Sequence, residues 1–260
     1  MKTATPVSVR TAPFEQPLPD LHGVAAGATV DGVKPLNTTW LGRVPYAPTF
    51  ALQQSLAQRR GAGDVDDTLL LLEHDAVYTL GRRATDAEVL LDERALEARG
   101  IAVEHTDRGG RVTYHGPGQL VGYPIIDIGL NADLVAYVRS IERALIAVAA
   151  TYGIAAGTVE GLTGVWVGDA KLAAIGVHIA RGITTHGFAI NVSTDLSAFN
   201  GIVPCGIVDR GVTSIEALSG MAPPVEEVAG RAGVALAQEL GRTARECVPS
   251  DLGIEVPIGV

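Results

Sequence analysis

Residues 164–192 read GVWVGDAKLAAIGVHIARGITTHGFAINV, three apolar runs separated by the two-residue turns Gly168-Asp169 and Arg181-Gly182. Short extended runs joined by two-residue turns that contain glycine are typical of antiparallel hairpins. We therefore predict strands over residues 164–167, 172–179 and 183–192, each paired with the next along the chain.

Helical patterns occupy the chain on both sides of these hairpins. Between residues 133 and 152 the apolar side chains recur at helical spacing, at Leu134, Val138, Ile141, Leu145 and Val148. Further helices are expected over residues 48–60, 92–99 and 225–240, and further strands over 68–73, 76–80, 101–105, 111–115 and 119–128. Asp92 and Gly100 are the expected caps of the second helix. Strands paired by hairpins, with helices between the sets, indicate an α+β or mixed α/β fold.

The length and the N-terminal composition indicate one folded domain. A chain of 260 residues suits a single domain or at most two small ones. Residues 1–37 contain five prolines and show neither helical nor strand periodicity, so we expect a flexible extension there. Residues 38–260 are then expected to form the folded domain.

The net charge of −9 argues against a protein that binds nucleic acid or a membrane surface, because both functions need a basic face. The longest apolar runs, 69–72 and 144–150, are much shorter than the roughly 20 residues of a membrane span. No basic segment followed by an apolar core occurs at the N-terminus, so we expect a cytoplasmic protein. The two cysteines, Cys205 and Cys247, are too few for a disulfide scaffold.

The glycine-rich stretch RGGRVTYHGPGQ, residues 108–119, is the first candidate for chemistry. Its four glycines allow the backbone to approach a ligand closely and to present N–H groups. His115 can donate or accept a proton there, although a glycine-rich hairpin with an exposed histidine is the alternative. The stretch lacks the lysine of a Walker loop and the strand–GxGxxG–helix arrangement, so those kinds of phosphate binding are not expected.

Cys205 and Lys171 are the candidate reactive residues. Cys205 lies between proline and glycine in VPCGI, residues 203–207, a setting that suits an accessible nucleophile; a small buried hydrophobic residue is the alternative. Cys247 lies in a polar stretch near the C-terminus and is interpreted as incidental. Lys171 is one of three lysines and follows a predicted turn. It is either a solvated residue at a strand end or an amine that loses its proton when desolvated.

The histidines do not indicate a metal or cofactor site. His178, His186 and Asn191 lie on the strands that follow Lys171, and their spacing fits no zinc pattern. We therefore expect neither a metal nor a cofactor. His74 either lines a pocket or is a surface residue at the end of a strand.

Taken together, these segments resemble the lipoyl(octanoyl) transferase family. The matching stretches lie between about Trp40 and Gly220: VYTLG at 77–81, residues 108–119, GVWV at 164–167, KLAAIGV at 171–177, HGFAINV at 186–192 and PCG at 204–206. Asp75-Ala76 departs from the family pattern, in which prolines commonly follow the histidine. The resemblance implies a biotin/lipoate protein ligase-like catalytic domain, with a mixed, largely antiparallel sheet flanked by helices.

The same resemblance implies a reaction and the residues that perform it. An octanoyl group would pass from octanoyl-acyl carrier protein, through a thioester on Cys205, to a lysine of a lipoyl domain, with Lys171 activating the thiol. The receivers would be the lipoyl domains of 2-oxo-acid dehydrogenase acyltransferase subunits and the glycine cleavage H protein. The acyl substrate would be bound by Arg108, Gly109, Gly110, Arg111, Val112, Thr113, Tyr114, His115, Ala174, Ile175, Gly176, Gly187, Phe188 and Ala189.

Two alternatives stay open. An ATP-dependent lipoate or biotin protein ligase of the same fold uses lysine to stabilise an acyl-adenylate and needs no cysteine. A non-catalytic module that binds carrier proteins would keep the fold without the reaction. Because acyl carrier proteins are acidic, we also expect a basic patch at the mouth of the site, drawn from Arg43, Arg82, Arg83, Arg108 and Arg111.

Overall fold

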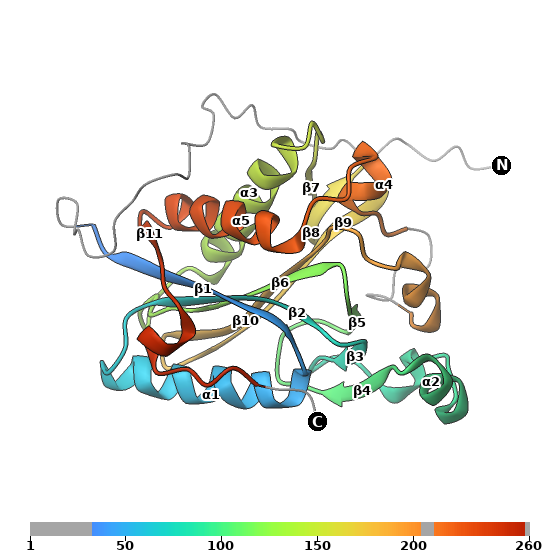
Figure 1. The fold of residues 1–260 in the computed structure, drawn as a ribbon, viewed down its shortest axis with the longest axis horizontal. Helices are drawn as coiled ribbons and strands as arrows, with labels where there is room; N and C mark the ends of the chain where they lie inside the picture. Colours follow the sequence, from blue (N-terminus) through green and yellow to red (C-terminus); the bar gives the residue numbers. More distant parts are fainter. Residues whose placement is uncertain (1–32, 204–210, 258–260) are drawn as a thin grey trace.

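A computed structural model describes residues 33–203 and 211–257 of the chain. In these residues, eight strands form one sheet in the order β11-β1-β2-β6-β10-β9-β8-β7 (Figure 1). Their bounds, in that order, are Thr243–Glu246, Pro35–Val44, Thr68–His74, Gln119–Ile125, Ile183–Asn191, Ala170–Ala180, Leu162–Val167 and Gly157–Val159. β1 pairs in parallel with β2 and β11, and the other neighbours are antiparallel. The predicted mixed, largely antiparallel sheet is confirmed.

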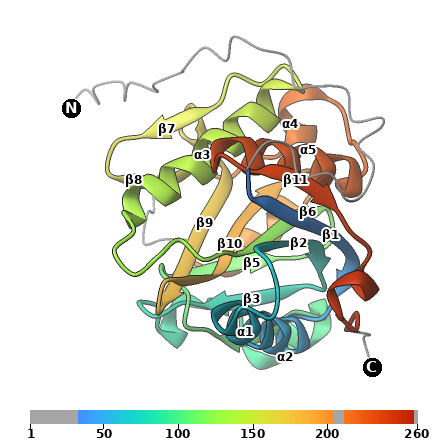
Figure 2. The ribbon, with the colours of Figure 1, turned by 90° about the vertical axis from the view of Figure 1, so that its left-hand side faces the viewer.

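Helices cover both faces of this sheet. α3 (Leu134–Ala150) and α5 (Val225–Glu239) pack together on one face, and α1 (Tyr46–Ala62) lies on the other (Figure 1, Figure 2). The short helix α4 (Ile215–Ser219) leads into α5. None of the helices in the described part of the chain is long and apolar enough to cross a membrane.

The leucine run of β2 shows how the sheet is held between the two helical layers. Leu69 and Leu71 belong to the apolar cluster that contains α3 and α5, whereas Leu70 and Leu72 belong to the cluster with α1. Successive side chains of a strand point to opposite faces, so four consecutive leucines supply both layers. All four are at most 3% exposed, and the core therefore lies on both sides of the sheet.

A second, three-stranded sheet lies beside the large one. Its order is β4-β3-β5, with bounds Ala102–His105, Val77–Leu80 and Val112–His115. The helix α2 (Glu93–Arg99) and the 3-10 helix Leu196–Gly201 accompany it, and further 3-10 turns span Asp86–Glu88 and Pro249–Leu252. The small sheet presents the loop between β4 and β5, residues 106–111, to the large sheet.

Helix ends that carry strong capping signals were predicted correctly from the sequence. The side chain of Asp92 accepts a hydrogen bond from the N–H of Ala95, and Gly100 ends α2 with a φ of +61°. α1 ends at Ala62, two residues later than expected, and Gly63 closes it in the left-handed conformation, with a φ of +84°. The two predicted hairpins of β8, β9 and β10 are confirmed.

β1 corrects the expected start of the domain. It begins at Pro35, inside the expected extension 1–37, and Leu36 is fully buried in the core. β1 pairs in parallel with strands that are distant in sequence, so no hairpin signal marks it. Residues 1–32 lie outside the described residues.

Candidate active site

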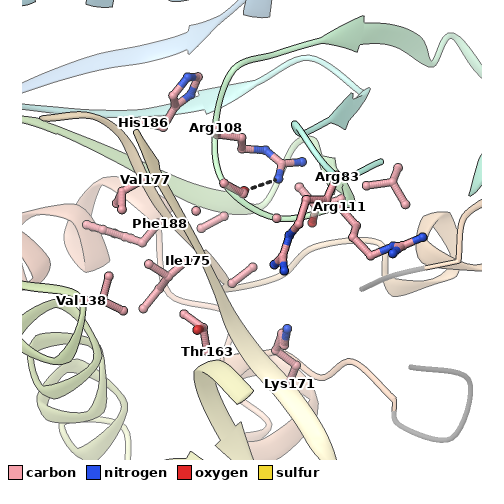
Figure 3. A pocket seen from close by; sticks show the side chains of 18 of the residues that line it. Arg83, Arg108, Arg111, Val138, Thr163, Lys171, Ile175, Val177, His186 and Phe188 are labelled. Carbon is pink, nitrogen blue, oxygen red and sulfur yellow. Dashed lines mark hydrogen bonds between the residues drawn. The ribbon is translucent and has the colours of Figure 1, made fainter. Parts of the chain in front are cut away.

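A cavity of about 410 Å³ is bordered by β9, β10 and the 106–111 loop (Figure 3). Val138 of α3, Ile175 and Val177 of β9 and Phe188 of β10 bring apolar side chains to one side of it. Basic side chains lie on the other side. A cavity with an apolar wall and a few polar groups suits a ligand with a hydrocarbon chain and one polar end.

The 106–111 loop lies directly on β9 because glycines allow the two backbones to meet. The N–H of Gly109 donates to the carbonyl of Val177 at 3.0 Å. A Cβ on Gly176 would come within 2.8 Å of the Gly109 carbonyl oxygen. A side chain at position 176 would therefore push the loop off the strand, so the shape of the cavity depends on this glycine.

Arg108 is a buried residue that fastens the same loop to the small sheet. Its guanidinium donates to the hydroxyl of Thr79 at 2.8 and 3.2 Å and to the carbonyls of Thr79 and Gly109. These bonds tie the loop to β3 and give the buried guanidinium polar partners. Arg108 is only 8% exposed, so it is not one of the arginines of the expected docking patch.

The rim of the cavity is basic. Arg83 and Arg111 line it, and the exposed Arg82 is next in the chain. The guanidinium of Arg111 also donates to both carboxylate oxygens of Glu88, at 2.9 and 3.1 Å. Arg43 does not line the cavity and instead pairs with an exposed aspartate after β2, at 3.4 Å. Of the expected patch, the structure therefore brings Arg83 and Arg111 to the rim.

His115 is a buried histidine in the cavity wall. It is 6% exposed, and its Nδ1 lies 2.8 Å from Oε1 of Gln119. Burial lowers the pKa of His115 well below its usual value, and the neighbouring His74 and Arg108 lower it further. Its ring stacks on Tyr46, with centroids 6.3 Å apart. At neutral pH His115 is therefore an uncharged hydrogen-bonding group, and the alternative of an exposed histidine is wrong.

Further aromatic and histidine side chains extend this end of the cavity. Tyr46, Tyr123 and His186 line it, although the sequence predicted no binding role for them. The Nε2 of His186 lies 2.7 Å from the carboxylate of Asp107, and its backbone N–H donates to Gln53 of α1 at 2.8 Å. Burial lowers the pKa of His186, although the hydrogen bond to Asp107 opposes the shift. This end of the cavity is polar in composition and carries an uncharged imidazole.

His74 lies behind this wall and is fully buried. Its Nδ1 lies 2.8 Å from the carbonyl oxygen of Val44, and its Nε2 lies 2.8 Å from the hydroxyl of Tyr123. Because a carbonyl can only accept, Nδ1 carries the proton and Nε2 accepts from Tyr123. Burial lowers the pKa of His74 to about 4. His74 is neither a surface residue nor part of the lining, and it acts as a support for Tyr123.

Lys171 lies at the opposite end of the cavity from His186 (Figure 3). Its Nζ is 4.7 Å from the centre of the Trp166 ring, a cation–π distance. Its backbone N–H donates to the carbonyl of Gly211 at 2.9 Å, and its carbonyl accepts from the N–H of Thr213 at 3.0 Å. The lysine is therefore held both by its backbone and by its ammonium group.

Cys205, the predicted nucleophile, lies outside the described residues. The residues on either side of that stretch are located. The N–H of Val203 donates to the carbonyl of Glu88 at 2.9 Å, and the carboxylate of Glu88 binds an arginine of the rim. Gly211 accepts from the backbone of Lys171. Of the described residues that flank this stretch, Gly211 is therefore bonded to the lining Lys171, and Val203 to the residue that binds the lining Arg111.

The predicted binding residues converge on one cavity, with one exception. The cavity is lined by Arg108, Gly109, Gly110, Arg111, Val112, Thr113, His115, Ala174, Ile175, Gly176, Gly187, Phe188 and Ala189. Tyr114 packs instead against Tyr78 and Phe199 in the core of the small sheet, with centroids 5.8 and 5.5 Å apart. This packing corrects the expected place of Tyr114 among the lining residues.

The sequence also missed lining residues that come from α3, from the β7–β8 turn and from the start of β8, namely Leu134, Val138, Gly161, Leu162 and Thr163. The helical pattern predicted that Leu134 and Val138 would be apolar face residues. It could not show that they would cover a cavity and not the core, because that depends on packing between distant elements.

Comparisons with known proteins find similar sequences. A family model described as the lipoyl protein ligase A/B catalytic domain matches residues 45–237. An octanoyltransferase of Mycolicibacterium gilvum is 47% identical over 230 residues, which cover 86% of this chain and 93% of that protein. An octanoyltransferase of Chloroflexus aggregans is 50% identical, with 76% of this chain and 92% of that protein covered.

Solved structures share the fold at low identity. A crystal structure of lipoate-protein ligase A bound with ATP has a TM-score of 0.66 at 18% identity, covering 82% of this chain and 88% of that one. A bipartite lipoate protein ligase from Thermoplasma acidophilum has a TM-score of 0.65 at 19% identity, covering 82% and 86%. These likenesses confirm the lipoate protein ligase fold of the catalytic domain.

Proposed function

Because this chain belongs to the lipoyl protein ligase A/B catalytic-domain family and to its octanoyltransferases, we propose that it transfers octanoyl from octanoyl-acyl carrier protein to a lipoyl-domain lysine. The observation that carries this proposal is the cavity, whose apolar side chains line a space of about 410 Å³ with Lys171 at one end. At ~0.8 kcal/mol per methylene, burial of an eight-carbon chain contributes about 5 kcal/mol.

In the first step of this proposal Cys205 receives the octanoyl group. Its Sγ attacks the carbonyl carbon of the carrier thioester, a new carbon–sulfur bond forms, and the carrier thiol leaves with a proton. One thioester replaces another, so the step is nearly balanced in free energy. The positions of Val203 and Gly211, which flank the stretch with Cys205, support this assignment because both are bonded beside the cavity.

In the second step the lysine amine of the lipoyl domain attacks the thioester on Cys205. An amide forms, the carbon–sulfur bond breaks, and the sulfur of Cys205 recovers the proton that the amine loses. A thioester is converted to an amide, which is downhill and consumes no ATP. This acylation would be the first step in the lipoylation of that domain.

Lys171 supplies the proton transfers. A free thiol with a pKa of ~8.5 is ionised to only a few per cent at neutral pH, so the nucleophile needs help. An ammonium over the face of Trp166 can stabilise the thiolate or give its proton to the departing carrier thiol. After that transfer the neutral amine can take a proton back, and no other side chain is required for the cycle.

The partners of this proposal match the charge of the rim. Acyl carrier proteins are acidic, and Arg83 and Arg111 present positive charge at the cavity, with the exposed Arg82 next in the chain. The proposed receivers are the lipoyl domains of 2-oxo-acid dehydrogenase acyltransferase subunits and the glycine cleavage H protein. The cytoplasmic location stays a prediction.

The proposal is tested by incubating the protein with octanoyl-acyl carrier protein and a lipoyl domain without ATP. The mass of the lipoyl domain is then measured by mass spectrometry. An octanoyl group on its lysine supports the transferase. In a parallel reaction, free octanoate and ATP replace the carrier. Modification in that reaction alone would indicate a ligase, and modification in neither would indicate a non-catalytic carrier-binding module.

A further inference from the structure

A chain of hydrogen bonds connects the cavity to the backbone of Lys171. The Nδ1 of His115 lies 2.8 Å from Oε1 of Gln119, and Nε2 of Gln119 lies 2.9 Å from Oδ1 of Asn191. The Nδ2 of Asn191 donates to the carbonyl of Thr213 at 2.9 Å, and the N–H of Thr213 donates to the carbonyl of Lys171 at 3.0 Å. Both amide side chains are at most 4% exposed.

The far end of this chain fixes the direction of every hydrogen bond in it. The carbonyl of Thr213 can only accept, so Asn191 must present its NH₂ group there and its oxygen to Gln119. Gln119 must then present its NH₂ group to Asn191, and the same group also donates to the carbonyl of Tyr114 at 3.1 Å. Its oxygen is left for His115, which donates from Nδ1. Each of the two amides has one usable orientation.

β8 pairs with Lys171 through Trp166 on one side, but on the other side the backbone of Lys171 depends on this arrangement because the pairing with β10 does not reach it. The pairing of β10 with β9 ends at Ile190 and Ala173. Beyond that point a parallel bridge to Val212 takes the place of β10, through the two bonds that Lys171 makes to the residues on either side. Asn191 is the last residue of β10, and its amide holds this bridging segment to the sheet.

We propose that Asn191 and Gln119 are positioning residues that hold Lys171 in place for proton transfer. The inference rests on the proposed function, in which Lys171 activates the thiol. Without the Asn191 donor, the buried carbonyl of Thr213 loses its partner, and the segment that pairs with Lys171 loses its direct hydrogen bond to β10. The bond from the N–H of Glu216 to the carbonyl of Val192 still holds the segment farther along. The wall that holds the acyl chain lies farther along β9 and is unaffected.

The test uses Asn191→Asp, which is nearly isosteric and still offers an oxygen to Gln119 but replaces the donor to Thr213 with an oxygen. We expect the maximal single-turnover rate of octanoyl loading to fall roughly 10- to 100-fold, as for a misplaced catalytic group. The carrier concentration at half-maximal rate should stay near the parental value. Raising the pH should partly restore the rate, because the thiol then ionises without help.

A double-mutant cycle separates positioning from a general loss of structure. Adding Asn191→Asp to a Lys171→Ala variant should cause no further loss, because the side chain to be positioned is already gone. Gln119→Glu removes the donor to Asn191 and should lower the loading rate by less than Asn191→Asp does. It should likewise cause no further loss in the Lys171→Ala background, and it replaces Asn191→Asp in the test if that variant does not fold.

Thr184→Val is the matched control on the same strand. The hydroxyl of Thr184 accepts from the N–H of Ile126 at 3.0 Å and donates to the carbonyl of Pro124 at 2.6 Å, at the other end of β10. Its loss should lower the melting temperature and leave loading at the parental rate. Parental loading by Asn191→Asp, or an additive loss in the Lys171→Ala background, would overturn the inference.

Hydrogen exchange keeps this inference distinct from the proposed function. The amides of Lys171 and Thr213 should lose protection in Asn191→Asp and keep it in Thr184→Val. If the parent protein loads no octanoyl group, the proposed function fails. Even then, unchanged protection of these two amides in Asn191→Asp would contradict the positioning role, and lost protection would support it.

Discussion

The ammonium nitrogen of Lys171 lies 4.7 Å from the centre of the Trp166 ring. Trp166 is 1% exposed, so its ring cannot turn away from the lysine without opening the core. An indole face attracts a cation, and this contact helps to hold the Lys171 side chain at one end of the cavity.

Substitution of Lys171 separates its charge from its proton. A guanidinium can also lie over Trp166, but it cannot lose a proton in a protein. We expect Lys171→Arg to load octanoyl roughly 100- to 10,000-fold more slowly, the usual size of a general acid–base contribution. Lys171→Ala should lose a similar amount and recover partly at high pH. Single-turnover loading against pH measures this, and a fully active Lys171→Arg variant would leave the lysine with a purely electrostatic role.

Gly176→Ala tests the close approach of the 106–111 loop to β9. The new Cβ would lie 2.8 Å from the Gly109 carbonyl oxygen, and relief of that contact should cost about 1–3 kcal/mol of unfolding free energy. The loop should also shift, so the carrier concentration at half-maximal loading should rise. Gly61→Ala is the control, because its Cβ meets its neighbour at an ordinary 3.7 Å. An equal carrier concentration at half-maximal loading in both variants would show that the contact between the 106–111 loop and β9 does not shape the cavity.

The rim arginines are expected to act on association with the carrier. Arg82→Glu combined with Arg83→Glu should slow loading at low ionic strength, and the difference from the parent should shrink as salt is added. Arg43→Glu is the control, because Arg43 is exposed but does not line the cavity. If the double variant loads at the parental rate in low salt, the carrier docks elsewhere.

The buried His74 makes stability depend on pH. Its pKa is about 4 in the folded protein against 6.5 for an exposed histidine, so the unfolded chain takes up the proton first as the pH falls. The stability is therefore complete above pH 6.5 and is lost toward pH 4, by about 3 kcal/mol for this group. His74→Gln can keep both hydrogen bonds without titrating. Urea unfolding from about pH 7 to pH 4.5 should show a smaller decline for this variant than for the parent.

An equal decline in His74→Gln would show that other groups cause the acid sensitivity. His115 and His186 leave a residual slope of the same sign, because burial lowers the pKa of each.

The parts of this molecule that the sequence predicts are those with local causes. The Asp92 cap and Gly100 fix α2, and the turns at 168–169 and 181–182 fix the hairpins. The parallel strand β1 has no comparable signal, because its partners are distant in sequence.

The same distinction applies to the cavity. Motif segments predicted most of the lining, because the motif glycines and polar residues lie together on the 106–111 loop, β5, β9 and β10. The sequence did not identify Tyr46 and Tyr123 as lining residues, because a single tyrosine among apolar residues is also typical of a core position. Tyr114 was wrongly expected to line the cavity, because it lies inside the motif, whereas its side chain packs into the core of the small sheet. Whether a tyrosine lines the cavity or lies in the core depends on packing between elements that are distant in sequence.

The most direct test of the account is the site of acylation after brief incubation with octanoyl-acyl carrier protein and no acceptor, read by intact mass and peptide mapping. We predict one octanoyl thioester on Cys205, absent from Cys205→Ser and discharged when a lipoyl domain is added. Cys247→Ser should load like the parent, because Cys247 is half-buried and burial raises the pKa of its thiol. An octanoyl group on Cys247, or a thioester still formed by Cys205→Ser, would contradict the account.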